Sequence, residues 1–369
     1  DSLTTNNAAE VKVNLFLFHF GTQWSSSSIL WLAFAKLHPD ITYTILTDKT
    51  DFSMDGYETD HSDAVEILSN VRLHTTNIAE IESKSNLLLN LTSPSEKVRI
   101  GHPYKLCDYR VLFGKLYESL LVEGQFTHWG WVDFDTIIGN LFSPSFFPVQ
   151  SVAAHTHVSP HITNPSTTAA HCRATSIRPA LSCFDVISTD HIALTNGPYA
   201  VMKFNERTTQ LYKLIPSLLR NLKDVPNKPT FAEELGLKGV INFHVAGKRM
   251  SVFRPSLEMN CGDNWIYVHG AIYNLPSLDE CVYFHYGGSP HRKHTVGKVM
   301  SAMFTDLVQF GESGLMHGEM GVVYYCGVHH FINTSSQVIL MAPYRQGGVA
   351  RAGDSVICCD YHGSSHSLW

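Results

Sequence analysis

The N-terminal third of the chain alternates between β-rich runs and an apolar helical segment, and this alternation constrains the fold more than any other feature. Residues 11–20 (VKVNLFLFHF) form a β-rich run, and four serines then precede an apolar helical segment at 29–37. Pro39 stops that helix, and residues 41–46 and 71–74 predict two further strands. This order predicts an α/β fold with a mostly parallel, twisted sheet flanked by helices, because parallel strands need crossover connections.

The carboxyl ends of these strands form the expected ligand-binding edge of the sheet. In open α/β sheets, ligands bind just beyond the carboxyl ends of the strands. Those ends correspond here to residues 19–21 (HFG) and to the Thr-Asp pair at 47–48. We therefore expect both segments to take part in a binding site.

The rest of the chain predicts one large α/β domain and a smaller C-terminal part. A helix is expected over residues 105–121, and the apolar run HWGWVDFDTII follows it at 128–138. Serine, threonine, proline, histidine and alanine dominate residues 151–182, which predicts an insertion loop. We therefore expect an α/β domain over residues 1–299 and a β-rich extension over residues 300–369. Further regular segments are expected at 184–188, 199–204 and 206–222 and, in the extension, at 321–326, 337–341 and 355–359.

The composition narrows the class of protein. With 44% hydrophobic residues in 369, the chain has enough apolar material for a packed core, which excludes a disordered protein. Its net charge of −6 provides no chain-wide basic surface, so we expect no nucleic-acid partner. No apolar run reaches the roughly 18 residues that a membrane-spanning helix requires, so we expect no transmembrane segment in this sequence.

Cysteines and glycosylation motifs bear on the compartment. The eight cysteines are scattered and include no C-x-x-C, which argues against a zinc site of that spacing. Asn90 and Asn333 each begin an N-x-[ST] sequon. The sequence also begins at Asp1 without an initiator methionine, which we interpret as a trimmed or processed product. We expect the secretory pathway lumen, Golgi or ER, with the cytoplasm as the alternative.

Asp133 and Asp135 are the most informative residues of the chain. They follow the apolar residues 128–132 at an expected strand end, and residues i and i+2 of a strand share a face. Burying a carboxylate among apolar residues costs several kcal/mol unless a cation or hydrogen bonds compensate. Two carboxylates on one face suit a hard divalent cation such as Mg²⁺ or Mn²⁺. The alternative is a turn in which both aspartates accept hydrogen bonds from backbone amides.

Several segments together resemble a family of GT-A-fold glycosyltransferases that use nucleotide-sugar donors. HPYKLCDYRVLFGKLYES at 102–119 and FTHWGWVDFDTIIGNL at 126–141 are similar to the PYKLCD helix and the W-G-x-x-D-x-D motif of that family. The likeness runs in order from the strand at 11–20 to YFHYGGSPHRK at 283–293. The expected insertion loop and the C-terminal extension have no counterpart in it.

The resemblance implies transfer of a sugar from a nucleotide-diphosphate sugar, such as a UDP-sugar, to a glycan or glycoconjugate acceptor. In such enzymes the acidic pair binds Mn²⁺ or Mg²⁺ on the donor diphosphate, which stabilises the departing nucleoside diphosphate. Carried over to this sequence, Asp133 and Asp135 are metal ligands, and Asp135 is also a catalytic residue. The residues that would bind the donor are Phe18, His19, Phe20, Asp48, Lys105, Asp108, Arg110, Asp133, Gly197, Gly288 and Lys293.

The closing segment also resembles that of the glycogenin-like retaining glycosyltransferases. There a histidine completes the metal coordination and a lysine holds the diphosphate, so the likeness makes His285 a third metal ligand. His291 stands where that lysine is expected. The GT-A resemblance also implies three further catalytic candidates, Asn196 near the donor sugar and Glu233 and Glu234 near the acceptor. The glycogenin-like closing segment implies retention of the anomeric configuration, and the alternative is inversion with one of the glutamates as base.

Two other classes of function stay open. A metal-dependent phosphohydrolase or nucleotidyltransferase would use the same aspartate pair, although no P-loop accompanies it. A catalytically degenerate glycan-binding protein would keep the fold without metal dependence. The chain has no G-x-S-x-G and no G-x-G-x-x-G after its first strand, which argues against a serine hydrolase and a Rossmann dehydrogenase.

Overall fold

The computed structural model groups the chain into two compact units. Unit 1 comprises residues 1–24, 39–133 and 142–256, and unit 2 comprises residues 25–38, 134–141 and 257–369. The expected insertion loop lies outside the described residues. The structure describes residues 11–21, 38–50, 69–142, 184–187 and 197–223, together with short stretches between 24 and 35, between 236 and 285, and from 320 onward.

Unit 1 contains a seven-stranded sheet that is mostly parallel. The strand order is β3-β2-β1-β4-β7-β6-β8. β3, β2, β1 and β4 are parallel neighbours, as are β6 and β8, whereas β7 runs antiparallel to β4 and β6. This mixed sheet, flanked by helices, confirms the predicted α/β class. The strands are β1 (Val13–His19), β2 (Ile41–Thr47), β3 (Val71–Thr75), β4 (His128–Val132), β6 (Val186–Ile187), β7 (Tyr199–Lys203) and β8 (Val252–Phe253).

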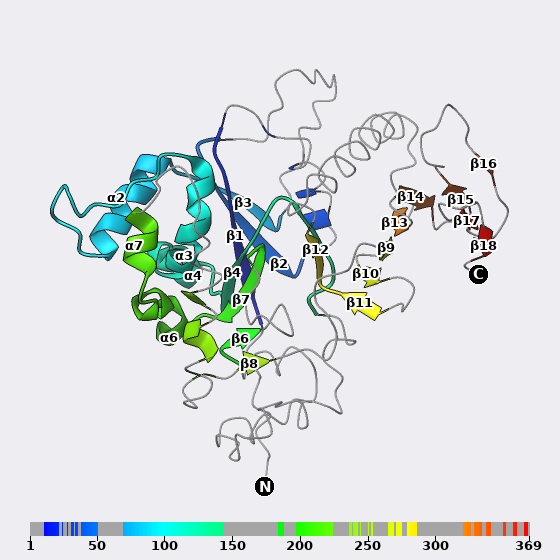
Figure 1. The fold of residues 1–369 in the computed structure, drawn as a ribbon. Coiled ribbons are helices and arrows are strands. Elements are labelled where there is room, and N and C mark those ends of the chain that lie inside the picture. The colour runs from blue at the N-terminus through cyan, green and yellow to red at the C-terminus, as the bar shows by residue number, and fades with distance from the viewer. Residues whose placement is uncertain are drawn as a thin grey trace, which may run out of the picture. The chain divides into compact units, whose positions relative to one another are not determined.

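The direction of chain progress reverses at β1, as it does in a Rossmann-like sheet. The chain builds outward from β1 through β2 to β3, and it then returns to place β4 on the other side of β1 (Figure 1). At such a switch point a crevice opens beyond the carboxyl ends of the two strands, and ligands bind there. Phe16 of β1 is paired with Trp131 of β4, so Phe18 and Asp133 lie at one level of this edge.

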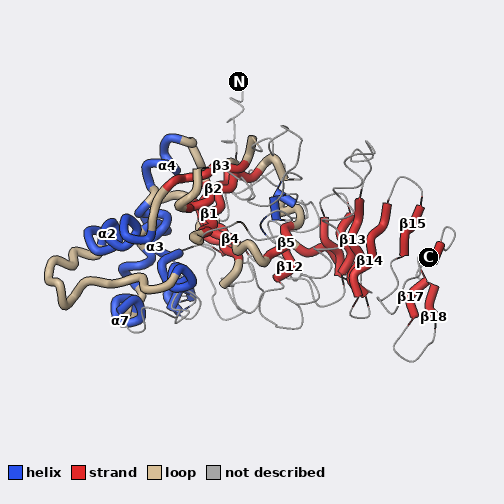
Figure 2. The backbone as a smooth tube through the Cα atoms, turned by 90° about the horizontal axis from the view of Figure 1, so that it is seen from above, coloured by secondary structure: helices blue, strands red, loops and turns tan. Residues whose placement is uncertain are grey.

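The helices of unit 1 are shorter than the sequence predicts. The helix expected at 105–121 is divided into η1, α3 and α4, and the one expected at 206–222 into α6, η3 and α7, with Pro216 before α7. Figure 2 shows α2, α3 and α7 gathered on one side of the β1–β4 part of the sheet. The described residues contain no helix that is long and apolar enough to cross a membrane. The helices are α2 (Ile78–Leu88), η1 (Pro103–Tyr109), α3 (Arg110–Leu116), α4 (Glu118–Glu123), α6 (Glu206–Thr209), η3 (Leu211–Leu214) and α7 (Leu218–Lys223).

The core of unit 1 lies between this sheet and its helices. All of β4 is buried, as is most of β1, which is typical of parallel strands that are covered on both faces. Phe16 packs against Phe113 and Tyr117 of the helical layer, with ring centroids 6.0 and 5.5 Å away. The Trp129 indole donates to the Thr208 hydroxyl at 3.3 Å. These contacts fix β4, and with it the position of Asp133.

Unit 2 contains a second seven-stranded sheet, with the order β11-β10-β9-β13-β14-β15-β16 and antiparallel pairing. Strands from before and after residue 300 share it, so the β-rich part begins earlier than the expected boundary. β5 pairs with β12 and β17 with β18, and the described residues within 29–37 are helical, as predicted. The strands are β5 (Thr136–Ile138), β9 (Trp265–Val268), β10 (Ala271–Asn274), β11 (Asp279–Cys281), β12 (Tyr283–His285), β13 (Met320–Tyr325), β14 (Val328–Asn333), β15 (Gln337–Leu340), β16 (Ala350–Arg351), β17 (Ile357–Cys359) and β18 (Ser365–Ser367).

Candidate metal centre

Asp133 and Asp135 lie in the short connection between β4 and β5, at the end of a strand as expected, but they do not lie on the strand itself, which corrects the expectation that they share a strand face. Asp133 directly follows β4, and Phe134 and Asp135 form a turn before β5 begins. The two strands belong to different sheets. The pair therefore does not share a face through the two-residue period of a strand, and the turn brings the carboxylates together instead.

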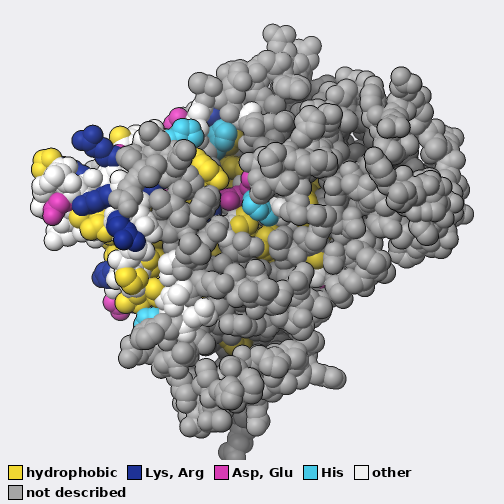
Figure 3. All heavy atoms as spheres, in the orientation of Figure 1, with side chains coloured by type: hydrophobic (Ala, Val, Ile, Leu, Met, Phe, Trp, Pro, Cys, Tyr) yellow, Lys and Arg dark blue, Asp and Glu magenta, His cyan; other side chains and the backbone are white. Residues whose placement is uncertain are grey.

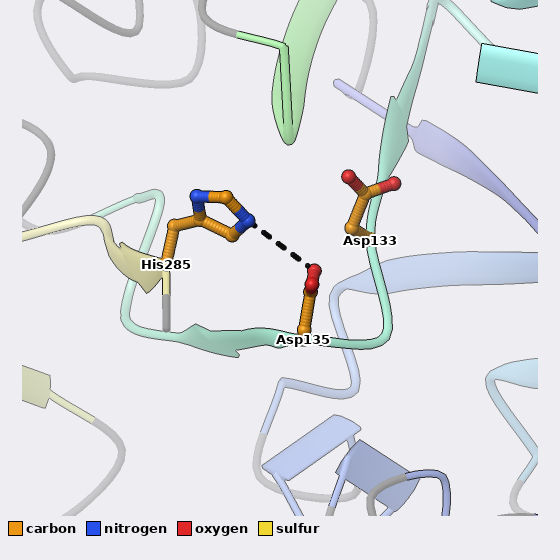
Figure 4. A group of neighbouring side chains, drawn as sticks. All are labelled: Asp133, Asp135 and His285. Carbon is orange, nitrogen blue, oxygen red and sulfur yellow. Dashed lines mark ion pairs between the residues drawn. The ribbon is translucent and has the colours of Figure 1, made fainter. Parts of the chain in front are cut away.

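His285 completes a group of three possible metal ligands. It ends β12, where it is paired with Thr136, the residue after Asp135. Its Nε2 atom lies 3.4 Å from Oδ1 of Asp135, and Figure 4 shows the two side chains pointing toward one another. One ligand atom each from Asp133, Asp135 and His285 can be chosen so that all lie within 4.8 Å of one another. The predicted ligands therefore converge.

Backbone contacts hold β12 against β5. The amide of Gly139 donates to the carbonyl of Val282 at 2.6 Å. A Cβ atom on Gly139 would lie only 2.7 Å from the carbonyl oxygen of Cys281, so this approach requires glycine. The His38 ring lies within hydrogen-bond distance of the Ile138 carbonyl, at 3.0 Å. The position of His285 thus follows from the packing of two short strands.

The donor set fits a divalent cation. Carboxylate oxygens and an imidazole nitrogen are both ligands for transition metals, whereas Mg²⁺ prefers oxygen ligands alone. Ligand atoms held about 2.1 Å from one ion lie roughly 3–4 Å from each other. The 3.4 Å between His285 and Asp135 falls in this range, and the whole group lies within 4.8 Å. The three side chains are 24–32% exposed, so substrate can reach them. In Figure 3 acidic and histidine side chains are visible at the surface, bordered by hydrophobic ones.

Arg110 connects this group to the neighbouring strands. Its NH2 group forms an ion pair with Oδ1 of Asp133, and its NH1 group donates to the carbonyl of Gly197 at 2.5 Å. The guanidinium also lies 5.5 Å from the centroid of the Phe18 ring. The Trp131 indole donates to the same Gly197 carbonyl at 2.9 Å. The expected donor-binding residues Arg110, Asp133, Gly197 and Phe18 therefore lie together.

Aromatic side chains line the carboxyl edge of β1. Phe18, His19 and Phe20 are all partly exposed there, and Asp48 is exposed at the end of the neighbouring β2. The His19 ring stacks on Trp24, with centroids 4.4 Å apart and an interplanar angle of 15°. The structure thus places these four expected donor-binding residues at one edge, and it adds Trp24, which the sequence did not indicate.

Lys105 and Asp108 occupy a different environment from the expected one. Both side chains are fully buried, and they bond to each other at 2.6 Å. The Lys105 ammonium also donates to the carbonyl of Asn221 in α7 at 2.7 Å. Because neither side chain reaches solvent, this pair joins η1 to α7 and does not face a donor.

Five expected site residues lie outside the described part of the chain. They are the catalytic candidates Asn196, Glu233 and Glu234 and the donor-binding candidates Gly288 and Lys293.

Comparison with known proteins identifies one similar family. A family of unknown function (DUF6625) matches residues 15–158, which include the carboxyl edge of β1, Arg110 and both aspartates but not His285. No curated protein matches the chain.

Proposed function

We propose that this protein is a metal-dependent glycosyltransferase of the GT-A type, which transfers a sugar from a nucleotide-diphosphate donor to a glycan or glycoconjugate. The observation that carries the proposal is the convergence of Asp133, Asp135 and His285, in which Asp133 directly follows β4 at the carboxyl edge of a Rossmann-like sheet. Two neighbouring aspartates supply two oxygens, and a histidine far along the chain supplies one nitrogen, where Asp133 ends a strand at the edge at which such sheets bind nucleotides. The sequence resemblance supplies the choice of reaction.

The residues have complementary roles in the proposal. Asp133, Asp135 and His285 hold the cation, and the imidazole nitrogen favours Mn²⁺ over Mg²⁺. The bound cation supplies Lewis-acid stabilisation of charge on the departing nucleoside diphosphate. The aromatic edge at Phe18 and His19 provides rings for contact with the base of a donor such as a UDP-sugar.

The chain's own charges explain why the donor would need the cation. Asp133 and Asp135 carry two negative charges, and Arg110 carries one positive charge, so this part of the site has a net charge of about −1 when both carboxylates are ionised. An anionic diphosphate is repelled by such a site. A divalent cation reverses the sign and makes the site attractive to a diphosphate.

We propose retention of the anomeric configuration, from the resemblance of the His285 segment. The carbonyl of Gly197 is fixed by Arg110 and Trp131, which supports a rigid approach at the donor sugar. Under this proposal Glu233 and Glu234 position the substrates. In an inverting reaction, one of them would act as the base.

We also propose that the protein functions in the secretory pathway. Cys281, just before the strand that carries His285, is disulfide-bonded. Disulfides persist mainly in oxidising compartments.

A panel of nucleotide sugars tests the function. The protein is incubated with each donor and a mixture of glycan acceptors, with Mn²⁺ or with a chelator, and free nucleoside diphosphate and glycosylated product are both measured. The proposal expects Mn²⁺-dependent product with at least one donor, and loss of that product in Asp135→Asn. Release of inorganic phosphate, or nucleotidyl transfer, would identify the alternative class of enzyme. Metal-independent binding without turnover would identify a glycan-binding protein.

A further inference from the structure

We infer that Arg110 is a positioning residue for the metal centre, an inference that rests on the proposed function. Arg110 begins α3, and its guanidinium joins two other segments of unit 1. One nitrogen pairs with the carboxylate of Asp133, and the other donates to the carbonyl of Gly197. Arg110 thereby holds the Asp133 carboxylate in a fixed orientation relative to the ends of β4 and β7.

The two side chains of the Arg110–Asp133 ion pair differ in solvent exposure, which distinguishes this pair from one that is fully buried. The Arg110 side chain is 3% exposed, whereas that of Asp133 is 24% exposed. By contrast, both members of the Lys105–Asp108 pair are fully buried. A buried cation needs several partners to compensate for lost hydration, and Arg110 also donates to Sγ of Cys107 at 3.2 Å. The cation is therefore anchored inside the unit, while the carboxylate that it holds reaches the surface.

The geometry of the guanidinium is essential to this role. Arginine presents its donors as a rigid planar fork, which can serve two acceptors in fixed directions, whereas a lysine ammonium is a single flexible point charge. The Asp133 amide also donates to the carbonyl of Pro198 at 2.9 Å. The aspartate is thus tied to the segment before β7 by its backbone directly and by its side chain through Arg110.

Positioning and simple charge make opposite predictions. A positive charge beside a metal ligand repels a divalent cation, so if only its charge mattered, removing Arg110 would tighten metal binding and Arg110→Lys would change nothing. If Arg110 positions Asp133, both Arg110→Lys and Arg110→Gln weaken metal binding, because neither restores the two-acceptor bridge. Loss of a partner that orients a metal ligand typically costs about 10- to 100-fold in metal affinity.

The test is a Mn²⁺ titration of the full chain, followed through the EPR signal of the free ion, which requires no donor and no turnover. Wild type, Arg110→Lys and Arg110→Gln are compared with Arg207→Lys. Arg207 makes an ion pair with Asp185 at 3.1 Å and belongs to neither the metal group nor its neighbours, so it is a matched control for an Arg-to-Lys change. We expect about 10- to 100-fold weaker Mn²⁺ binding in both Arg110 variants and unchanged binding in Arg207→Lys.

Each other outcome is decisive. Wild-type affinity in a folded Arg110→Lys variant, or tighter binding in Arg110→Gln, overturns the positioning role while the metal centre stands. Absence of Mn²⁺ binding in the wild type overturns the proposed function together with this inference. Thermal unfolding of each variant is recorded, and if Arg110→Lys lacks a cooperative transition, Arg110→Gln decides, because it no longer buries a charge.

Discussion

Gly130 of β4 provides a severe test of the packing that places Asp133. A Cβ atom at this position would lie 1.8 Å from the carbonyl oxygen of Ala200 in the neighbouring β7, and 2.7 Å from its carbonyl carbon. Since such contacts are essentially never closer than 3.0 Å, Gly130→Ala requires the strands to separate by more than 1 Å. The obstacle is backbone, so no rotamer change relieves it. We expect a cost near the upper end of overpacking, about 3 kcal/mol.

The assay for Gly130→Ala is thermal unfolding followed by tryptophan fluorescence, because Trp129 and Trp131 flank the substituted residue and are buried. A cost of about 3 kcal/mol corresponds to a fall in Tm of roughly 6–12 °C for a domain of 150–250 residues. The control is Gly239→Ala, at an exposed helical position where a Cβ atom meets nothing within 4 Å. Gly239→Ala should raise stability slightly, by up to about 1 kcal/mol. Equal Tm values for the two variants would refute the close approach of β4 and β7.

Three further predictions concern the metal centre, pH and modification. Asp135→Asn should lower the rate of sugar transfer by more than about 100-fold, because it alters a metal ligand itself. The Tm should change little, because the side chain is partly exposed. Near-wild-type turnover at saturating Mn²⁺ would contradict the role of Asp135 as a ligand. Burial, together with the nearby Lys84 ammonium, lowers the pKa of His74 from 6.5. The unfolded state therefore binds more protons than the folded state, and the stability of the fold falls as the pH drops below about 6.5. His74→Gln should therefore lose less stability than wild type between pH 7.5 and 5.5, measured as paired Tm values, and parallel losses would count against this. Asn90 begins a sequon, is exposed and has a φ of 56° in the turn after α2. In a host with N-glycosylation, Asn90→Gln should therefore lower the intact mass of the protein by one glycan. An unchanged glycan mass would exclude this site.

The strands of unit 1 were predictable because their signals are local. Apolar runs at 11–20, 41–46 and 71–74 are each followed by turn residues, and the structure has β1, β2 and β3 within two residues of them. The division of 128–138 was not predictable, because its apolar character is continuous. This run forms two strands, β4 and β5, because its first part packs through Gly130 on the backbone of β7, whereas Gly139, just after it, packs on the backbone of Cys281.

The missed helix α2 shows the limit of hydrophobic periodicity. Its face has a single large apolar residue that is fully buried, Ile81, so its pattern is weak. The available signal was the cap, in which the side chain of Asn77 accepts from the amide of Glu80 at 2.9 Å.

The candidate site was predictable only in part. Two carboxylates in an apolar run identify Asp133 and Asp135 directly, but His285 is one of 21 histidines and needed the family resemblance. The burial of Lys105 and Asp108 depends on the packing of η1 against α7 through Asn221, which leaves no local trace in the sequence.

The central claim is that a divalent cation links the aspartates to a nucleoside diphosphate. It is tested most directly by the thermal unfolding of wild type and Asp135→Asn with UDP, in the presence of Mn²⁺ or of a chelator. A ligand at 100 times its Kd adds roughly 2.7 kcal/mol of stability. We predict that UDP raises the Tm of the wild type only when Mn²⁺ is present, and that it does not raise the Tm of Asp135→Asn. Equal UDP-induced shifts with Mn²⁺ and with the chelator would contradict a metal-bridged donor site.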